Sequence, residues 1–336
     1  MLTGGGDSPG INAVIRAVTA RAVARDDEVT GILRGWEGLM EGDVRPLDRD
    51  AVRGILKQGG TILGTSRRDP YVHGDGWESV RPTIEEHGLE ALIVIGGDGT
   101  LSTAERLHSE ARLPVIGVPK TIDNDIAGTE VTFGFDTAVH IATEAIDRLT
   151  TTAEAHNRVM LVEVMGRTRG WIAVYSGLAS GADVILIPEV PYDLDEVATL
   201  LRRRHEQGHR YSIVVVAEGI APPADPETPK VLDAFGFERL GGVSYPLAAE
   251  LERLTGFETR VTVLGYLQRG GTPTAHDRVL ATRFGVAAAD AAAGHQFGTM
   301  AALRAGKIVL VPLEEVCTAP RGVPPDLYDV ARTFFP

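Results

Sequence analysis

Carboxylates, glycines and threonines follow two neighbouring apolar segments of the chain. The first group, Gly96-Gly97-Asp98-Gly99-Thr100, follows the apolar run 91–95, and the second, Pro119-Lys120-Thr121-Ile122-Asp123-Asn124-Asp125, follows the run 114–118. Such runs are typical of buried parallel strands, and open α/β sheets bind ligands at the carboxyl ends of their strands. The sequence therefore predicts one crevice with three carboxylates that suits a metal-bound polyphosphate beside a base, and the chemistry is phosphoryl transfer.

Asp98 is the candidate metal ligand. Its flanking glycines, Gly97 and Gly99, let the backbone approach a phosphate closely, and Mg²⁺ keeps most of its waters when one carboxylate holds it. We expect Mg²⁺ as the cofactor. The pentapeptide that ends at Thr100 also occurs in NAD kinases and lipid kinases, so alone it indicates only a nucleotide or polyphosphate site. A strand-end turn that uses Asp and Gly for its geometry is the alternative.

The second group supplies the candidate base. Asp123 and Asp125 flank Asn124, and on an extended segment positions two apart face the same way. One carboxylate can then accept a hydroxyl proton while the other assists the metal or the base. Thr121 can donate to a transferring phosphate. The alternative is an Asx-rich turn whose carboxylates are solvated.

Arginines near predicted strand ends can neutralise phosphates. Arg67 and Arg68 follow a predicted strand, and a guanidinium there can neutralise the transferring group, although Arg68 also fits a solvated basic loop. A phosphate on a second substrate would need further cations, bidentate where geometry permits. The candidates are Arg158, Arg167, Arg260 and Arg269, each of which can instead form a surface ion pair. Glu218, at the end of the run 211–217, can bind a sugar hydroxyl.

Alternating strands and helices predict an α/β fold with parallel sheets and right-handed crossovers. We expect two sheets, one before and one after about residue 138. The stretch 36–43 is expected to be a loop, 61–68 is expected to be a strand that runs into a basic loop, and 260–267 is expected to be a strand. The proline-rich stretch 221–236 is expected to be a surface excursion.

The bulk composition excludes several classes of protein. The chain has 336 residues, 43% of them hydrophobic, a net charge of −13 and one cysteine, Cys317. The length suggests two domains, the acidity argues against nucleic-acid binding, and a single cysteine allows no internal disulfide and fits the cytoplasm. No apolar run suggests a membrane span, and neither a zinc spacing nor a P-loop motif is present.

The beginning of the chain is unusual. A Gly-rich turn before a helix is an anion cradle, but about two strand residues precede the turn at 4–7. We expect the native chain to begin several residues upstream, with Met1 in place of a valine whose codon was read as a start.

Together these segments resemble the 6-phosphofructokinase family, in particular its actinobacterial ATP-dependent branch. The matching segments are GGGDSPGINAVIR at 4–16, GGTILGTSR at 59–67, GGDGT at 96–100, PKTIDND at 119–125, AIDRL at 145–149, VEVMGR at 162–167 and TRVTVLGYLQRGG at 259–271. The resemblance implies two doubly wound domains and transfer of the ATP γ-phosphate to the 1-hydroxyl of fructose 6-phosphate. It also implies a donor domain, 1–135 plus 267–317, and a sugar-phosphate domain, 136–266 plus 318–336, with the site in the cleft between them.

The resemblance also implies a role for each matching residue. Asp123 would be the base, Asp125 would orient metal and base, and Thr121 would touch the transferred phosphoryl group. The donor would meet Gly5, Arg67, Arg68, Gly97, Asp98, Gly99, Thr100 and Lys120. The sugar would meet Met165, Gly166, Arg167, Glu218, Tyr266 and, at its 6-phosphate, Arg269. Arg158 and Arg260 would reach in from a neighbouring subunit, so the site would need a homo-oligomer, usually a tetramer.

The identity of the phosphate donor stays open in the sequence. Lys120 is typical of the branch that uses pyrophosphate, but that branch carries aspartate at the position of Gly99, where glycine leaves room for the rest of ATP. Many bacterial members have histidine where this chain has Tyr266. We favour ATP, with a pyrophosphate-dependent enzyme as the alternative. Two remoter alternatives are a NAD or lipid kinase and an inactive sugar-phosphate sensor.

Overall fold

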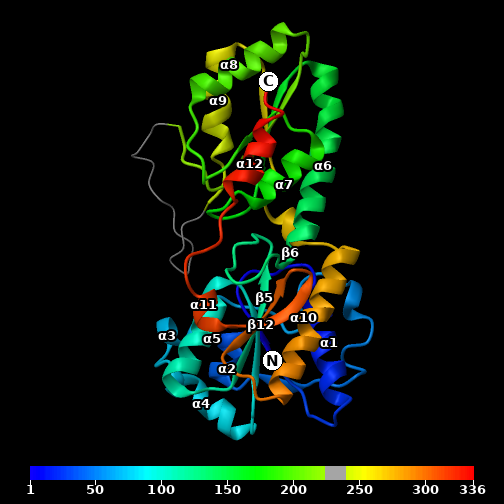
Figure 1. The fold of residues 1–336 in the computed structure, drawn as a ribbon, viewed down its shortest axis with the longest axis vertical. Helices are drawn as coiled ribbons and strands as arrows, with labels where there is room; N and C mark the ends of the chain where they lie inside the picture. Colours follow the sequence, from blue (N-terminus) through cyan, green and yellow to red (C-terminus); the bar gives the residue numbers. More distant parts are fainter. Residues whose placement is uncertain (224–239) are drawn as a thin grey trace. The chain divides into compact units, whose positions relative to one another are not determined.

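The computed structural model describes residues 1–223 and 240–336 and divides the chain into two compact units. Unit 1 comprises Met1–Thr137 and Arg269–Arg321, and unit 2 comprises Ala138–Gln268 and Gly322–Pro336. Each unit has its own mainly parallel sheet, which confirms the predicted α/β class (Figure 1). Most of the stretch 221–236, expected to be a surface excursion, lies outside the described residues.

The main sheet of unit 1 brings the two acidic segments to one edge. Its strands run in the order β1 (Leu2–Thr3), β4 (Leu92–Gly96), β5 (Val115–Thr121), β11 (Thr299–Arg304) and β12 (Lys307–Pro312), and β6 (Phe133–Gly134) also pairs with β5. The pairs are parallel except for the β11–β12 hairpin. Gly96 is in register with Pro119, so the segments that follow β4 and β5 leave the sheet side by side.

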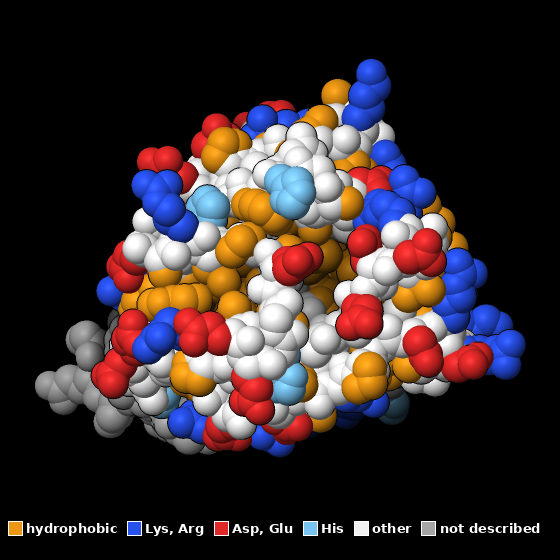
Figure 2. Space-filling view, turned by 90° about the horizontal axis from the view of Figure 1, so that it is seen from below, with side chains coloured by type: hydrophobic (Ala, Val, Ile, Leu, Met, Phe, Trp, Pro, Cys, Tyr) orange, Lys and Arg blue, Asp and Glu red, His pale blue; other side chains and the backbone are white. Residues whose placement is uncertain are grey.

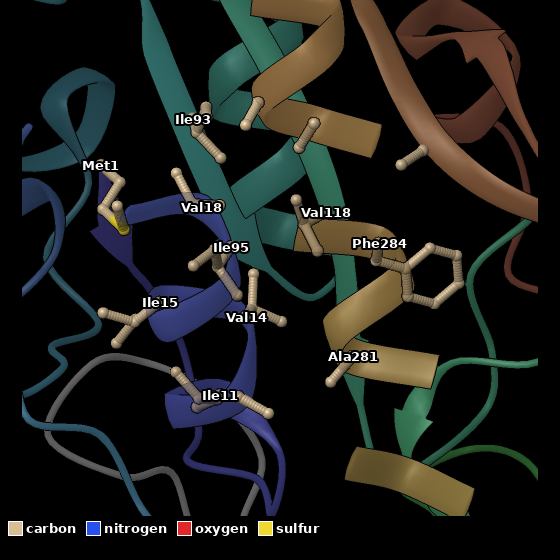
Figure 3. Packing of buried hydrophobic residues seen from close by; sticks show 14 of the residues in the cluster. Met1, Ile11, Val14, Ile15, Val18, Ile93, Ile95, Val118, Ala281 and Phe284 are labelled. Atoms are coloured by element: carbon tan, nitrogen blue, oxygen red, sulfur yellow. The ribbon is translucent and has the colours of Figure 1, made fainter. Parts of the chain in front are cut away.

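Helices cover both faces of this sheet because alternate strand residues point to opposite sides. Ile93 and Ile95 of β4 belong to one apolar cluster, whereas Leu92 and Val94 belong to another. In the first cluster the strands pack on α1 (Ile11–Val23) and α10 (Ala275–Ala293), as Figure 3 shows. The second cluster includes residues of α2 (Trp36–Glu41), α4 (Trp77–Glu86) and α5 (Asp98–Ala111).

Two predictions of local structure in unit 1 are wrong. The stretch 36–43 contains helix α2, because Trp36 and Leu39 lie on one helical face and are both buried. The stretch 61–68 is not a strand, because Gly64 has φ 67° and interrupts an extended conformation. Instead, Thr3 and Thr65 hold it beside the Gly-rich turn: the Thr3 hydroxyl donates to Gly64 O at 2.6 Å and the Thr65 hydroxyl to Gly5 O at 2.5 Å.

The sheet of unit 2 is parallel throughout its described strands. They run in the order β10 (Thr259–Val263), β7 (Val159–Val164), β9 (Ser212–Ala217) and β8 (Val184–Leu186). The predicted strand 260–267 ends early, because the chain turns at Gly265 (φ 47°) into the 3₁₀ helix η2 (Gly265–Arg269). The helices are α6 (Phe135–His156, which begins in unit 1), α7 (Trp171–Ser180), α8 (Leu194–Glu206), α9 (Ser244–Thr255) and α12 (Pro325–Arg332).

The remaining elements of unit 1 are short. They are the antiparallel pair β2 (Thr30–Ile32) and β3 (Val44–Pro46), η1 (Ile55–Lys57), α3 (Pro70–His73) and α11 (Leu313–Val316).

Within the described residues, no helix combines the length and apolarity needed to cross a membrane. Figure 2 shows acidic and basic side chains interspersed around a hollow in which apolar side chains are visible.

Candidate active site

The Gly-rich turn at 4–7 lies in unit 1, which is expected to bind the phosphate donor. Gly4 N donates to Ile95 O at 3.0 Å, so the turn leaves the sheet directly beside the end of β4. Gly5 has φ 77°, a left-handed conformation that glycine adopts without steric cost. Its N–H donates to Ser66 O at 3.2 Å, which ties the turn to the segment that carries Arg67 and Arg68.

Asp98 is the first residue of α5, immediately after β4. The N-cap residue is Gly97, which has no side chain to accept the first N–H groups of the helix. Uncapped N–H groups and the helix dipole favour an anion at this end. A Cβ at Gly96 would lie 2.4 Å from Cβ of Thr100, whereas a Cβ at Gly99 would meet no described heavy atom within 4 Å. The site is therefore closely packed at Gly96 and open at Gly99.

The acidic residues fit a metal shared with a phosphate rather than a metal held by protein alone. In residues 1–223 and 240–336, no group of three or more His, Cys, Asp or Glu side chains could hold a metal ion. Mg²⁺ is usually bound through one or two carboxylates together with waters and substrate phosphates. A single carboxylate, Asp98, at an anion-binding helix end is such a donor set.

Two cations converge on the Gly-rich turn. Lys120, 3% exposed on β5, donates from Nζ to Gly6 O at 2.5 Å. Arg269 donates from Nη1 to Asp7 O at 3.1 Å, and a Cβ at Gly6 would lie 2.8 Å from that nitrogen. Burial, followed by the nearby charge of Arg269, lowers the pKa of Lys120 to about 8, although Asp123 opposes the shift.

Asp123 and Asp125 lie just beyond the end of β5, 7% and 6% exposed. The prediction that an extended segment aligns these carboxylates is wrong, because Asn124 between them has φ 54°. A left-handed turn sets their orientation instead. Asp123 N donates to the Thr121 hydroxyl oxygen at 3.0 Å, which leaves the hydroxyl proton of Thr121 able to donate elsewhere.

The two consecutive arginines lie in the irregular segment beside the turn. Arg68 forms an ion pair with Glu41 of α2 at 2.7 Å, and Glu41 also pairs with Arg34 at 2.8 Å. The alternative for Arg68 was a solvated basic loop, and the structure shows a half-exposed side chain that is paired with a carboxylate. Contact of either Arg67 or Arg68 with a donor phosphate stays a prediction.

In unit 2, the loops that follow β7 and β9 are in direct contact. Val164 and Ala217 are in register at the ends of these strands. Arg167 has φ 54°, and its N–H donates to Glu218 Oε1 at 3.0 Å. A Cβ at residue 219 would lie 1.9 Å from Arg167 O, so Gly219 permits this close approach. The structure therefore brings together two of the residues expected to bind the sugar.

The structure places the other residues that are expected to bind the sugar in several different elements. Met165 N donates to Gln268 Oε1 at 3.3 Å, beside Gly166 (φ 139°). Tyr266, 79% exposed, lies in η2. Arg269, the residue that follows Gln268, belongs to unit 1.

The two arginines expected to serve a neighbouring subunit share one carboxylate. Arg158 lies 2.9 Å from Glu258, and Arg260 pairs with the same carboxylate. The hydrogen bond from Arg158 is the largest of the effects that lower the pKa of Glu258. Sequence reasoning missed Glu258, because a lone glutamate before a strand belongs to no motif.

Sequence reasoning also missed buried carboxylates that fix the surrounding loops. Asp277, fully buried in α10, accepts from Gly134 N at 2.9 Å and from Thr137 N at 2.8 Å. Burial raises its pKa, and these hydrogen bonds oppose the rise. The spacing Thr274-x-x-Asp277 resembles a helix-capping signature and could have indicated it. Glu163 likewise accepts from Gly242 N at 2.6 Å and Ser244 N at 2.9 Å.

Comparisons with curated proteins identify the family. A family model described as phosphofructokinase matches residues 1–292. A pyrophosphate–fructose 6-phosphate 1-phosphotransferase of Amycolatopsis methanolica is 54% identical over 338 residues, covering 100% of this chain and 98% of that protein. ATP-dependent 6-phosphofructokinase 3 of Streptomyces coelicolor is 54% identical over 337 residues, covering 99% of this chain and 98% of that one.

Solved structures have the same fold. The phosphofructokinase of Pichia pastoris in the T-state superposes with a TM-score of 0.83 at 32% identity, covering 99% of this chain and 36% of the longer yeast chain. A pyrophosphate-dependent phosphofructokinase of Marinobacter aquaeolei has a TM-score of 0.80 at 25% identity, covering 96% of this chain and 84% of that one. The chain described here therefore belongs to the phosphofructokinase family.

Proposed function

We propose that the chain is an ATP-dependent 6-phosphofructokinase that converts fructose 6-phosphate to fructose 1,6-bisphosphate in cytoplasmic glycolysis. The observation that supports ATP is the open space at Gly99, beside the helix end expected to hold the donor phosphates. ATP extends beyond its terminal phosphates, and a position with no described heavy atom within 4 Å would leave room for the donor to continue past it.

Asp123 would accept the proton of the sugar 1-hydroxyl as this oxygen attacks the terminal phosphorus. Asp125 would help to orient the base, and the Thr121 hydroxyl, which accepts from Asp123 N, would donate its proton to the transferring group. Arg67 and Arg68 would neutralise that group, as phosphoryl transfer requires. Mg²⁺ held through Asp98 would supply charge neutralisation on the donor phosphates.

Unit 2 would bind the sugar through Arg167, Glu218 and the neighbouring Met165 and Gly166. Arg269 of unit 1 would bind the 6-phosphate. Arg158 and Arg260 would contribute to the site of a neighbouring subunit in a homotetramer. In that assembly both arginines would exchange their shared partner, Glu258, for the sugar phosphate.

Pyrophosphate is the second candidate donor. The buried ammonium group of Lys120, which donates to the Gly-rich turn, could pair with a compact diphosphate. A relative that is 54% identical is named a pyrophosphate-dependent enzyme, and one named an ATP-dependent enzyme is equally similar. Overall similarity therefore does not discriminate between the donors.

A coupled assay of fructose 1,6-bisphosphate formation with each donor tests the proposal. We expect kcat/KM with ATP to exceed that with pyrophosphate by at least about tenfold, which is about 1.4 kcal/mol of differential transition-state binding. A preference for pyrophosphate would reject ATP but keep the sugar substrate. Turnover that does not depend on fructose 6-phosphate would reject both candidates.

Lys120 should make donor use depend on pH. Its pKa of about 8 means that it is charged below pH 8 and neutral above, so attraction for donor phosphates weakens as pH rises. We expect kcat/KM for the donor, which reports ionisations of the free enzyme, to fall through about pH 8. The variant Lys120→Met should have a lower kcat/KM without this decline, whereas a decline that persists in the variant would assign it to another group.

A further inference from the structure

We infer that Asn124 and Arg321 are positioning residues that fix the carboxylates of Asp123 and Asp125 through the backbone of the turn between them. The inference rests on the proposed function, in which Asp123 is the base. Neither Asn124 nor Arg321 is among the residues that the sequence assigned to a substrate. Both contact the turn without needing to contact a reactant.

The amide of Asn124 holds the turn from inside unit 1. Its side chain is 1% exposed, and its Oδ1 accepts from Thr132 N at 3.0 Å and lies 3.4 Å from the Thr132 hydroxyl. That hydroxyl also donates to Thr121 O at 2.8 Å. Thr132 thus connects the turn to the end of β5, where Thr121 accepts the N–H of Asp123.

The backbone of the turn is in a conformation that needs such support. Asn124 has φ 54°, which asparagine tolerates better than most residues but does not prefer. Without its two contacts to Thr132, the peptide groups on either side of residue 124 could rotate. Rotation there would redirect both neighbouring carboxylates, because each is attached to one of those peptide groups.

Arg321 holds the same turn from the C-terminal segment. Its backbone N–H donates to Asp125 O at 2.7 Å, and its Nη2 donates to Asn124 O at 3.1 Å. Two consecutive carbonyl groups of the turn are therefore fixed by one residue. Arg321 is also the last residue of unit 1 before the chain passes into unit 2. The final connection between the units is thus anchored on the turn that carries the proposed base.

These contacts matter for the rate because general-base catalysis depends on sub-ångström placement. A displacement of about 1 Å at a reacting group can cost about 10²-fold in rate. Loss of positioning should lower kcat, whereas KM for both substrates should change little, because neither residue is assigned to substrate binding.

The test of Asn124 separates the effect of its side-chain amide from the effect of its backbone conformation. Asn124→Gly keeps a residue suited to positive φ and removes the amide. The matched control is Asn157→Gly, because Asn157 has φ 53° but is exposed. We expect Asn124→Gly to lower kcat by about 10–100-fold, with both KM values within about twofold of wild type. Asn157→Gly should keep wild-type kcat.

The test of Arg321 uses chemical rescue. Arg321→Ala removes the guanidinium but keeps the backbone N–H, and we expect kcat to fall by about tenfold or more. Added ethylguanidinium should restore kcat several-fold, because the free cation can again donate to Asn124 O. The control is Arg304→Ala, because Arg304 donates to Gly128 O at 2.9 Å, beyond the turn. That variant should keep wild-type kcat and respond to no guanidinium.

Asp123→Asn distinguishes failure of this inference from failure of the proposed function. If Asp123→Asn keeps turnover, the proposed base is wrong and the positioning role falls with it. If Asp123→Asn is inactive while Asn124→Gly and Arg321→Ala keep wild-type kcat, the proposed function stands and the positioning inference is overturned. A loss through raised KM alone would also overturn it, as would a loss of kcat in Arg321→Ala that ethylguanidinium leaves unchanged.

Discussion

Replacing Asp123 with asparagine should abolish most turnover while leaving the protein folded. The amide has nearly the shape of the carboxylate but cannot accept a proton from the sugar hydroxyl. General-base catalysis contributes about 10²–10⁴-fold, so kcat should fall by that factor in a steady-state assay with saturating donor and fructose 6-phosphate. KM for either substrate should change far less than kcat.

The matched control is Asp147→Asn, which removes an exposed carboxylate from α6 by the same change in atoms. It should retain wild-type kcat. Turnover near wild type in Asp123→Asn would show that another group takes the proton. Asp125→Asn would then be the next variant to measure.

Replacing Gly99 with aspartate should suppress the use of ATP. Two unit charges 4 Å apart repel by about 4 kcal/mol at an effective dielectric constant of 20. Solvent at an open helix end screens part of this repulsion, so we expect kcat/KM for ATP to fall by about 10²-fold. The backbone should accept the change, because the Cβ position at Gly99 meets no described heavy atom within 4 Å.

Two control variants separate the steric effect of the substitution from its electrostatic effect. Gly99→Ala adds only the Cβ and should retain ATP turnover. Gly99→Asn matches aspartate in size without its charge and should lie between the other two variants. Full ATP activity in Gly99→Asp would contradict our interpretation of this position. Pyrophosphate turnover, measured in all three variants, would show whether the substitution also admits the smaller donor.

The sequence predicted the site best where side-chain chemistry and strand position coincide. Asp98 and Thr121 were placed correctly at strand ends because the apolar runs 91–95 and 114–118, which precede them, are typical of buried parallel strands. The prediction for the turn at Asn124 failed because the hydrogen-bond partners of this left-handed turn, Thr132 and Arg321, lie 8 and 197 positions away in the sequence. Local patterns do not report such contacts.

The same limit explains the local errors in the fold. The stretch 61–68 has the apolar residues of a strand, but hydrogen bonds from Thr3 and Thr65 hold it as an irregular segment. The carboxylate of Asp277 was missed although its capping spacing is visible, because nothing local shows that its partners would be Gly134 and Thr137. Residues that belong to recognisable motifs were easier to find than the residues that support them.

The contact between the loops after β7 and β9 has a consequence for ligand selection. Glu218 holds the Arg167 backbone, and the absence of a side chain at Gly219 lets the two loops touch. In the proposed function these loops bind the sugar. Loops that are already in contact lose little further conformational entropy when a ligand binds, and they would leave the site little freedom to widen. We therefore expect a ketose phosphate with an additional carbon to bind less well than fructose 6-phosphate, whichever phosphate donor is used.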